Sequence, residues 1–315
     1  MHSTVKYTAI SLLVFALFIS GLLAFNYAPD QPVSELTERW AQSPSQFIDI
    51  AGMQVHLRDE GPRDDPEPII LIHGTGASLH TWDGWVDALK SERRVVRFDL
   101  PAFGLTGPDP EDKYTIEHYA AFIVAVLDTL KIEQSVLVGN SLGGYIAWAT
   151  TILYPKKVTK LVLVDASGYP YAAKSVPLAF KLARTPIIKD VVKNILPRSL
   201  IEGSVKNVYG NPELVTDELV DRYYDLATRE GNRRALSLRF KQTIPGPLIE
   251  RLDEINIPTL ILWGEKDNLI PLIFAKQFSQ DIKHNQLMTF PALGHVPHEE
   301  DPLSTVNAFK AFLAK

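Results

Sequence analysis

Residues 139–143 place a serine between two glycines, in the pattern Gly-x-Ser-x-Gly centred on Ser141. The apolar run 135–138 before it is typical of a buried strand, and apolar residues recur at helical spacing after it. A chain that turns from strand to helix this quickly strains its central residue, and the flanking glycines let strand and helix approach closely. The pattern predicts a nucleophile elbow with the Ser141 hydroxyl exposed at a sharp corner.

A serine hydroxyl is a weak nucleophile at neutral pH, so it needs a base, and the base needs an orienting acid. Of the eight histidines, His295 follows the last expected strand. It therefore lies at the edge of the sheet where open α/β sheets bind ligands, and Gly294 allows its loop to bend sharply. We interpret His295 as the base. His298 is the alternative, whereas His73, which glycines surround, better suits an oxyanion-binding loop.

Two aspartates compete for the role of orienting acid. Asp267 ends the expected strand before the histidine loop, and Asp165 ends the strand after the elbow. The chain order serine, acid, histidine holds for both. We favour Asp267, because the turn 264–267 carries it away from the strand end. Asp165 could instead brace the entry to the following segment, and Glu265 is a less favoured local alternative.

An oxyanion hole needs two preorganised N–H donors, each of which stabilises the transition state by roughly 3–4 kcal/mol. Leu142 supplies the first candidate, because its amide lies at the start of a helix, where N–H groups lack partners. The second should come from the loop HGTG, 73–76, which follows a continuous apolar strand. The amide of Thr75 is our prediction and that of Gly76 the alternative.

The rest of the body must position these groups. Residues 47–50 and 54–58 are typical of an antiparallel hairpin. Further strands are expected at 69–72, 94–98, 135–138, 160–164, 259–263 and 286–290, and helices at 82–89, 115–130 and 302–313. Alternating strands and helices, with several uninterrupted apolar strands, predict an α/β fold with a mostly parallel central sheet and helices on both faces.

About ninety residues after Asp165 contain no convincing strand and many prolines. We predict that 166–250 is an inserted helical cap over the strand ends, and that 46–165 and 251–315 form the core. The first part of the cap, 174–198, is basic and apolar. It is expected to be an amphipathic helix pair with a solvated face, and a surface resting on lipid headgroups is the alternative.

The N-terminal run Thr8 to Phe25 has 18 residues without a charge. A transmembrane helix needs roughly 20 apolar residues. Because Lys6 precedes the run and acidic residues follow it, the positive-inside rule puts the body outside the cytoplasmic face. We therefore expect 1–28 to be an uncleaved single-pass anchor and 29–45 a polar linker. The alternative is a signal peptide that is cleaved from a secreted or periplasmic protein.

Composition excludes several classes of function. The net charge of −5 and the pI of about 5.9 give no electrostatic reason to expect a nucleic-acid partner. The absence of cysteine excludes disulfides and thiolate chemistry. Neither GxGxxG nor GxxxxGK[ST] occurs, and no spacing matches HExxH, so we expect no nucleotide cofactor and no metal. The oligomeric state is not readable from the sequence.

Five motifs in order, HGTG (73–76), DLPAFG (99–104), GNSLGG (139–144), WGEKD (263–267) and GHVPHEEDP (294–302), closely resemble the α/β-hydrolase fold superfamily over about residues 46–315. The resemblance implies Ser141 as nucleophile, Asp267 as acid and His295 as base, with oxyanion donors at Thr75 and Leu142 and a lid near 166–250. A serine at the elbow argues against the haloalkane dehalogenases and epoxide hydrolases, whose nucleophile is aspartate.

Two groups of the superfamily are most similar. Membrane-anchored monoacylglycerol-lipase-like enzymes and small bacterial lipases share the N-terminal apolar segment and the stretch 164–168. Meta-cleavage-product C–C hydrolases share Gly-Asn-Ser at the elbow, but usually carry tryptophan where this chain has Val296, and a longer glycine run after HG. The expected function is therefore hydrolysis of small-molecule or lipid carboxylic esters through an acyl-enzyme. C–C bond hydrolysis, or amidase or perhydrolase chemistry, is the alternative.

Overall fold

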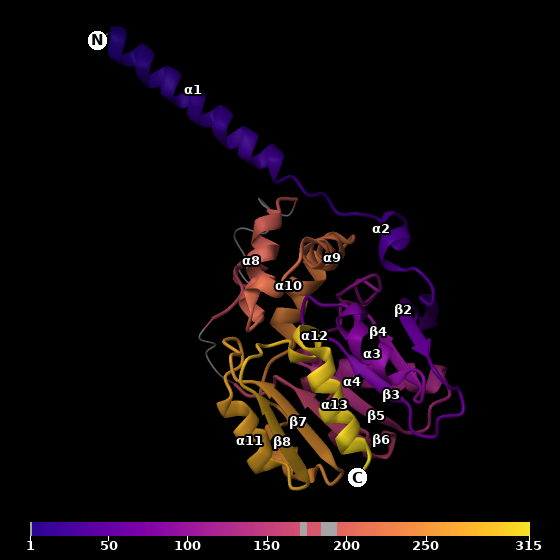
Figure 1. Ribbon diagram of the computed structural model, residues 1–315. Helices are drawn as coiled ribbons and strands as arrows, with labels where there is room; N and C mark the ends of the chain where they lie inside the picture. The colour runs from indigo at the N-terminus through magenta and orange to yellow at the C-terminus, as the bar shows by residue number, and fades with distance from the viewer. Residues whose placement is uncertain (1, 171–174, 184–193) are drawn as a thin grey trace.

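A computed structural model describes residues 2–170, 175–183 and 194–315 of the chain, without the side chains of residues 2–6, 8, 9, 16 and 19. Strands and helices alternate along most of it (Figure 1). The strands are β1 (Gln46–Ile50), β2 (Met53–Glu60), β3 (Ile69–Ile72), β4 (Val95–Phe98), β5 (Ser135–Asn140), β6 (Val158–Val164), β7 (Thr259–Gly264) and β8 (Asn285–Phe290).

The described helices are α1 (His2–Phe25), α2 (Val33–Trp40), α3 (Asp83–Leu89), α4 (Ile116–Thr129), α5 (Leu142–Leu153), α6 (Leu178–Ala183), α8 (Arg198–Val208), α9 (Asp217–Thr228), α10 (Asn232–Gln242), α11 (Ile273–Asp281), α12 (Pro297–Glu300) and α13 (Pro302–Leu313). Short 3₁₀ turns are η1 (Leu79–Trp82), η2 (Pro155–Lys157), η3 (Pro212–Leu214) and η4 (Ile249–Glu254).

One eight-stranded sheet runs in the order β1-β2-β4-β3-β5-β6-β7-β8. The pairs β1–β2 and β2–β4 are antiparallel, and all other neighbours are parallel. The expected hairpin and mostly parallel sheet are therefore confirmed. The strands that carry the site, β3, β5, β6 and β7, lie together in the parallel part, so their carboxyl ends meet at one edge.

Both faces of the sheet are covered by helices. Because successive strand side chains point to opposite faces, Ile70 and Ile72 pack in a core with α4, α5 and α11, whereas Ile69 and Leu71 pack in a second core with α3 and α13. Apart from Ser135, Asn140 and Thr259 at strand ends, the buried side chains of β3, β5 and β7 are apolar on both faces, which explains why these strands read as continuous hydrophobic runs.

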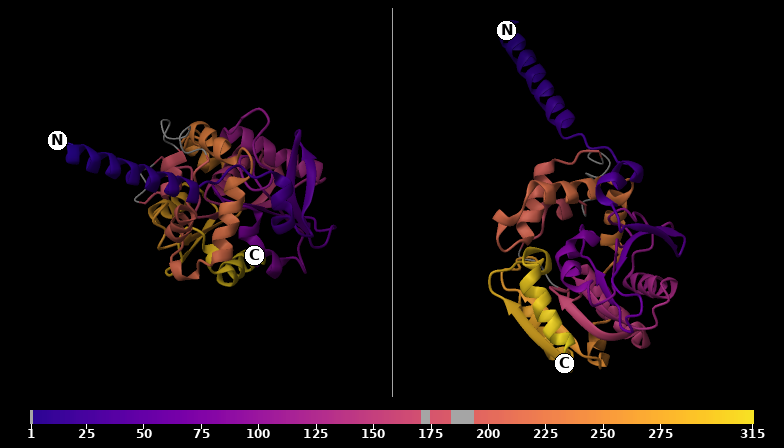
Figure 2. Two further views of the ribbon diagram at one scale, coloured as in Figure 1. Left: turned by 90° about the horizontal axis from the view of Figure 1, so that it is seen from above. Right: turned by 45° about the vertical axis from the view of Figure 1, so that its right-hand side comes forward.

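Between β6 and β7, the described residues form α6, α8, α9, α10 and short 3₁₀ turns, and no strand. We call α6, α8, α9 and α10 the cap helices. The views of Figures 1 and 2 place them on one side of the sheet, apart from α3, α11 and α13. The boundaries at 165/166 and 250/251 stay predictions. Much of the basic stretch 174–198, namely 174 and 184–193, lies outside the described residues.

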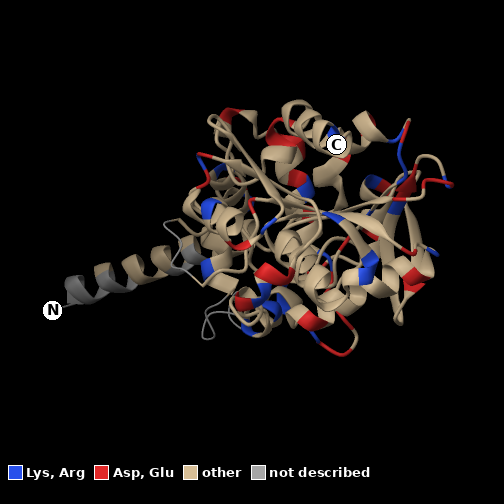
Figure 3. Ribbon diagram, turned by 90° about the horizontal axis from the view of Figure 1, so that it is seen from below, with Lys and Arg blue, Asp and Glu red and all other residues tan. Residues whose placement is uncertain are grey.

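The N-terminal segment 26–45, which we call the strap, lies against the cap helices before it reaches the sheet. Trp40 donates from Nε1 to Asp225 of α9 at 2.9 Å, and its carbonyl lies 2.9 Å from Nε2 of His80 in the core. Arg39 pairs with Asp221 at 3.0 Å. Figure 3 shows that acidic and basic residues are interspersed over the molecule. The stretch expected to be a polar linker thus contains α2 with a buried Trp40.

The predicted transmembrane anchor at residues 1–28 is contradicted. Residues 2–25 do form α1, which projects from the body (Figures 1 and 2). Within the part of the chain that the structure describes, however, no helix is long and apolar enough to cross a membrane. The uncharged run on which the prediction rested has 18 residues, close to the short limit for a span. The localisation as a single-pass membrane protein was therefore wrong.

Candidate active site

Ser141 occupies the turn between β5 and α5 with φ 55° and ψ −114°. A residue with a side chain rarely adopts these angles, because they strain the backbone. Such strained residues are typical of functional sites. The main chain holds it there. The N–H of Ser141 donates to the carbonyl of Val164 at 3.0 Å, and the Ser141 carbonyl accepts from the N–H groups of Tyr145 and Ser167 at 3.1 and 3.0 Å.

The glycines on either side of Ser141 are required by close backbone contacts. A Cβ on Gly143 would lie 2.2 Å from the carbonyl oxygen of Ile72, and one on Gly139 would lie 2.1 Å from the carbonyl oxygen of Gly143. Both neighbours are main-chain atoms of packed elements, which cannot turn aside as a flexible side chain can. The sequence pattern therefore reflects a steric requirement of the elbow.

We expect Gly143→Ala to lower the free energy of unfolding by about 2–4 kcal/mol, because the new methyl group must displace β3 or α5. Urea denaturation measures this change. Gly203→Ala is the matched control, since Gly203 also lies within a helix but a Cβ there meets nothing within 4 Å. The control should be unchanged or stabilised by up to about 1 kcal/mol through better helix propensity. Equal effects at both positions would contradict the steric argument.

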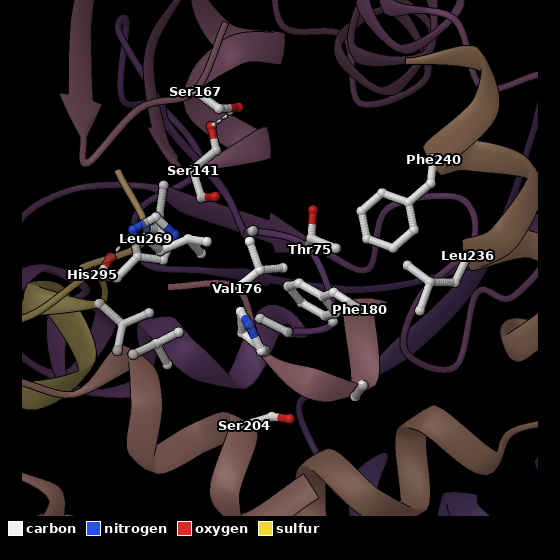
Figure 4. Close-up of a pocket in the computed structure, with 18 of the residues that line it drawn as sticks. Thr75, Ser141, Ser167, Val176, Phe180, Ser204, Leu236, Phe240, Leu269 and His295 are labelled. Carbon is white, nitrogen blue, oxygen red and sulfur yellow. Dashed lines mark hydrogen bonds between the residues drawn. The ribbon is translucent and has the colours of Figure 1, made fainter. Parts of the chain in front are cut away.

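A cavity of about 640 Å³ opens at the elbow, between the core and the cap helices. Ser141, Thr75 and His295 line its core side, and Phe180, from α6, lines its cap side (Figure 4). The lining is mostly aliphatic and aromatic, with few polar groups. A pocket of this size, largely apolar and holding a few convergent polar groups, is typical of a site for a small organic molecule.

His295 is held by a buried carboxylate. Its Nδ1 lies 2.7 Å from Oδ2 of Asp267, while Oδ1 of Asp267 accepts the N–H groups of Leu269 and Ile270 at 2.7 and 2.8 Å. Because the Asp267 carboxylate already accepts hydrogen bonds from two amides, it also accepts here, and Nδ1 of His295 is the donor to Oδ2. The other ring nitrogen, Nε2, is then the acceptor and is available to take a proton on the side of Ser141 (Figure 4).

Asp165, the competing acid, lies beside this pair without bonding to the histidine. Its Oδ1 accepts the N–H of Gly264 at 3.0 Å, and its side chain lies within hydrogen-bond reach of the Asp267 carboxylate. Burial and the neighbouring charge of Asp267 raise the pKa of Asp165 well above its ordinary value. The carboxylate in hydrogen-bond contact with His295 is that of Asp267.

The raised pKa of Asp165 makes a prediction about stability. A carboxyl group whose pKa is raised by folding stabilises the native state at acid pH and loses that contribution as pH rises toward the raised pKa. We expect the wild-type melting temperature to fall between pH 5 and pH 9 more steeply than that of Asp165→Asn, which cannot ionise. Thermal unfolding across this range measures the difference. Asp253→Asn, at an exposed position, is the control, and it should leave the pH dependence of the melting temperature unchanged.

Thr75 and Leu142, the expected oxyanion donors, lie on the two sides of the elbow. Within the described chain, neither main-chain N–H donates a hydrogen bond, so both are free for a ligand oxygen. Gly74, next to Thr75, lies close to the elbow, since a Cβ on it would lie 3.1 Å from Cβ of Ser141. His73 supports this loop, because its Nε2 accepts the N–H of Leu100 at 2.9 Å and its Nδ1 therefore donates to the carbonyl of Gly74 at 2.8 Å.

The alternative base and the alternative local acid lie elsewhere. His298 is buried on Trp82, and its Nε2 lies 3.0 Å from Oγ1 of Thr81. It lines a separate cavity of about 360 Å³ and does not line the cavity at Ser141. Glu265 is exposed and accepts from Oγ1 of Thr289 at 2.7 Å. One potential metal-ligand atom, a side-chain oxygen or nitrogen, from each of Asp165, Asp267 and His295 does lie within 4.8 Å of the other two. The 2.7 Å contact between the last two is nevertheless that of a direct hydrogen bond.

Three side chains that support the site were missed in the sequence. Asn140 donates from Nδ2 to the carbonyls of Val164 and His295, at 3.1 and 2.9 Å, and so ties the histidine loop to the elbow. Glu300 accepts the N–H groups of Gly210 and Gly294, and so ties that loop to the cap. Arg239 of α10 lines the cavity. Asn140 could have been found in the sequence, because it is a polar residue within the elbow motif. The roles of Glu300 and Arg239 depend on contacts between distant segments.

Comparisons with known proteins agree with this geometry. The alpha/beta hydrolase fold family matches residues 67–302. The 2-hydroxy-6-oxo-2,4-heptadienoate hydrolase of Pseudomonas putida is 30% identical over 277 residues, which cover 84% of this chain and 94% of that relative. An uncharacterised hydrolase of Bacillus subtilis is 27% identical over 266 residues, covering 83% of this chain and 95% of its own.

Among solved structures, the meta-cleavage product hydrolase CumD of Pseudomonas fluorescens is similar, with a TM-score of 0.74 and 25% identity over 86% of this chain and 97% of that one. Since the family match spans more than half of the sequence and these relatives are covered almost end to end, the chain belongs to the alpha/beta hydrolase fold family and is a hydrolase.

Proposed function

We propose that the chain is a serine hydrolase in which Ser141 is the nucleophile, His295 the base and Asp267 the acid that orients the base. The observation that carries the proposal is the 2.7 Å contact between Nδ1 of His295 and Oδ2 of Asp267, with Ser141 and His295 lining one cavity. A histidine fixed in this tautomer presents Nε2 as the proton acceptor that a serine hydroxyl needs.

The reaction then follows from the positions of these groups. Nε2 of His295 takes the proton of Ser141 as Oγ attacks a substrate carbonyl, and the Thr75 and Leu142 amides stabilise the negative charge that develops on the carbonyl oxygen. The same proton passes to the leaving group as the tetrahedral intermediate collapses to an acyl-enzyme. Water, activated by His295, hydrolyses the acyl-enzyme and restores Ser141.

For the substrate, C–C bond cleavage in an acidic vinylogous diketone is better supported than the ester hydrolysis expected from the sequence. Relatives named as hydrolases of 2-hydroxy-6-oxo-dienoates, including one that is 30% identical, support it. In such a reaction water is added across the bond beside the ketone, so that the acyl part leaves as a carboxylic acid and the carbon leaving group takes a proton.

Arg239 supports an acidic substrate. It is buried, with 8% of its surface exposed, and among the described residues that line the cavity no other arginine and no lysine, aspartate or glutamate occurs. Its guanidinium lies 4.9 Å from the ring centre of Phe240, which also lines the cavity. A buried guanidinium in an apolar pocket attracts a carboxylate strongly, because few waters screen the charges.

Turnover of 2-hydroxy-6-oxohepta-2,4-dienoate, followed by loss of its dienol absorbance, tests this proposal against p-nitrophenyl esters of increasing chain length. We expect Arg239→Gln to raise KM for the dienoate about 10- to 100-fold, the value of one hydrogen bond to a charged group. The same substitution should change KM for the neutral esters much less. Arg233→Gln, which removes an arginine paired with Asp30 outside the cavity, is the matched control.

A carboxylic ester hydrolase is the second candidate, and the apolar lining favours it. Val176, Phe180 and Phe240 would pack against an acyl chain. Ser141-dependent turnover of the esters, with none of the dienoate, would establish this candidate and overturn the first. Turnover of neither, with Ser141 still reactive toward a fluorophosphonate, would direct attention to amide substrates.

A further inference from the structure

A second serine, histidine and aspartate lie in hydrogen-bond contact outside the active site. Nδ1 of His56, on β2, lies 2.7 Å from Oδ2 of Asp99, which follows β4, and Nε2 of His56 lies 2.8 Å from Oγ of Ser45 in the strap. His56 and Asp99 are fully buried, and Ser45 is partly exposed. None of the three lines the cavity at Ser141.

The neighbours of Asp99 fix the direction of the first hydrogen bond. Its Oδ1 accepts the N–H of Leu79 at 2.8 Å, and its Oδ2 accepts the N–H of Leu105 at 2.8 Å. Amide N–H groups can only donate, so Asp99 acts as an ionised acceptor. Burial opposes its ionisation, but the neighbouring histidines, His56 first, hold the pKa of Asp99 below its ordinary value. His56 therefore donates from Nδ1, and its Nε2 lies on the side of Ser45.

Arg58 contacts the same serine. Its Nε donates to Oγ of Ser45 at 2.9 Å, and a guanidinium has no acceptor. The Ser45 oxygen therefore uses one lone pair for Arg58, and its own proton can point at Nε2 of His56, 2.8 Å away. The arrangement resembles the one that activates a serine, with an orienting carboxylate, a histidine beside the hydroxyl and a cation next to its oxygen.

We propose that Ser45 is a second nucleophilic serine, a covalent modification site for small activated acyl and phosphonyl electrophiles, with His56 as its base and Asp99 as the orienting acid. Oγ of Ser45 bonds to the electrophilic carbon or phosphorus atom, His56 takes the hydroxyl proton, and the leaving group departs with that proton. The exposed neighbours Gln42, Ser43 and Gln46 leave Ser45 open to solvent.

A fluorophosphonate tests the site in the folded Ser141→Ala protein, in which the proposed active-site nucleophile is absent. An Oγ–P bond forms, the P–F bond breaks and hydrogen fluoride is released. We expect one adduct, mapped by peptide mass spectrometry to Ser45. It should be lost in Ser141→Ala/Ser45→Ala and kept in Ser141→Ala/Ser43→Ala, which removes an exposed serine two residues earlier. Labelling in Ser141→Ala/His56→Gln should be at least tenfold slower.

Because His56 is buried and its replacement could unfold the chain, the melting temperature of each variant is measured, and urea-denatured Ser141→Ala gives the reactivity of Ser45 without the network. Folded Ser141→Ala should react at least tenfold faster than the denatured chain at Ser45. The proposal would be overturned if no adduct formed at Ser45, or if Ser45 and Ser43 reacted at equal rates. Equal rates at Ser45 in the folded and denatured chains would also overturn it. Ser45→Ala alone should leave substrate turnover unchanged, so this test does not depend on the proposed function.

Discussion

Replacing Ser141 with alanine should lower kcat by about 10⁴- to 10⁶-fold without unfolding the protein, since the loss of a triad serine removes the covalent pathway as a whole. Alanine is small enough to keep the elbow, whose geometry depends on main-chain bonds to Val164, Tyr145 and Ser167. Steady-state turnover of the dienoate and of p-nitrophenyl esters measures the loss, and thermal unfolding checks the fold.

Ser204→Ala is the matched control for this experiment. Ser204 also lines the cavity, but its hydroxyl donates to the carbonyl of Leu200 within α8 at 2.7 Å. Its removal should change kcat less than about tenfold, because no proton transfer depends on it. The loss of a nucleophile lowers turnover far below about 1% of the wild-type value. If Ser141→Ala kept more than that on every substrate, the assignment of the nucleophile would be wrong.

Asp267→Asn should lower kcat by about 10³- to 10⁴-fold, whereas Asp165→Asn should lower it less than tenfold. The amide of asparagine can donate to Nδ1 of His295, which would stabilise the tautomer that carries its proton on Nε2 and cannot accept one from Ser141. Asp165 makes no hydrogen bond to His295 among the described contacts, and burial and the charge of Asp267 raise its pKa, so its replacement by a neutral amide changes the site little.

The two substitutions are isosteric and lie in one buried cluster, so each serves as the control for the other. Turnover and melting temperature are measured for both variants, because a loss of activity counts only in a folded protein. A larger loss of kcat in Asp165→Asn than in Asp267→Asn would exchange the proposed roles.

Much of the fold was predictable because its signals are local. The strands at 69–72 and 259–264 are apolar on both faces, as buried parallel strands must be, and the described structure has strands at both ranges. The prediction of a membrane anchor failed because it rested on one uncharged run of marginal length, whereas no described helix is long and apolar enough to cross a membrane.

The sequence by itself determined the elbow, since the glycines at 139 and 143 meet a steric requirement that acts within a few residues. It favoured His295 over His298 and Asp267 over Asp165, but it could not show which of these side chains are in contact, because His298 is three residues away and Asp165 ends the neighbouring strand. Only the tertiary structure decided which carboxylate contacts Nδ1, through a hydrogen bond between residues 28 positions apart. Arg239 in the cavity and the network of Ser45, His56 and Asp99 likewise depend on packing between distant segments, for which a single sequence carries no local signal.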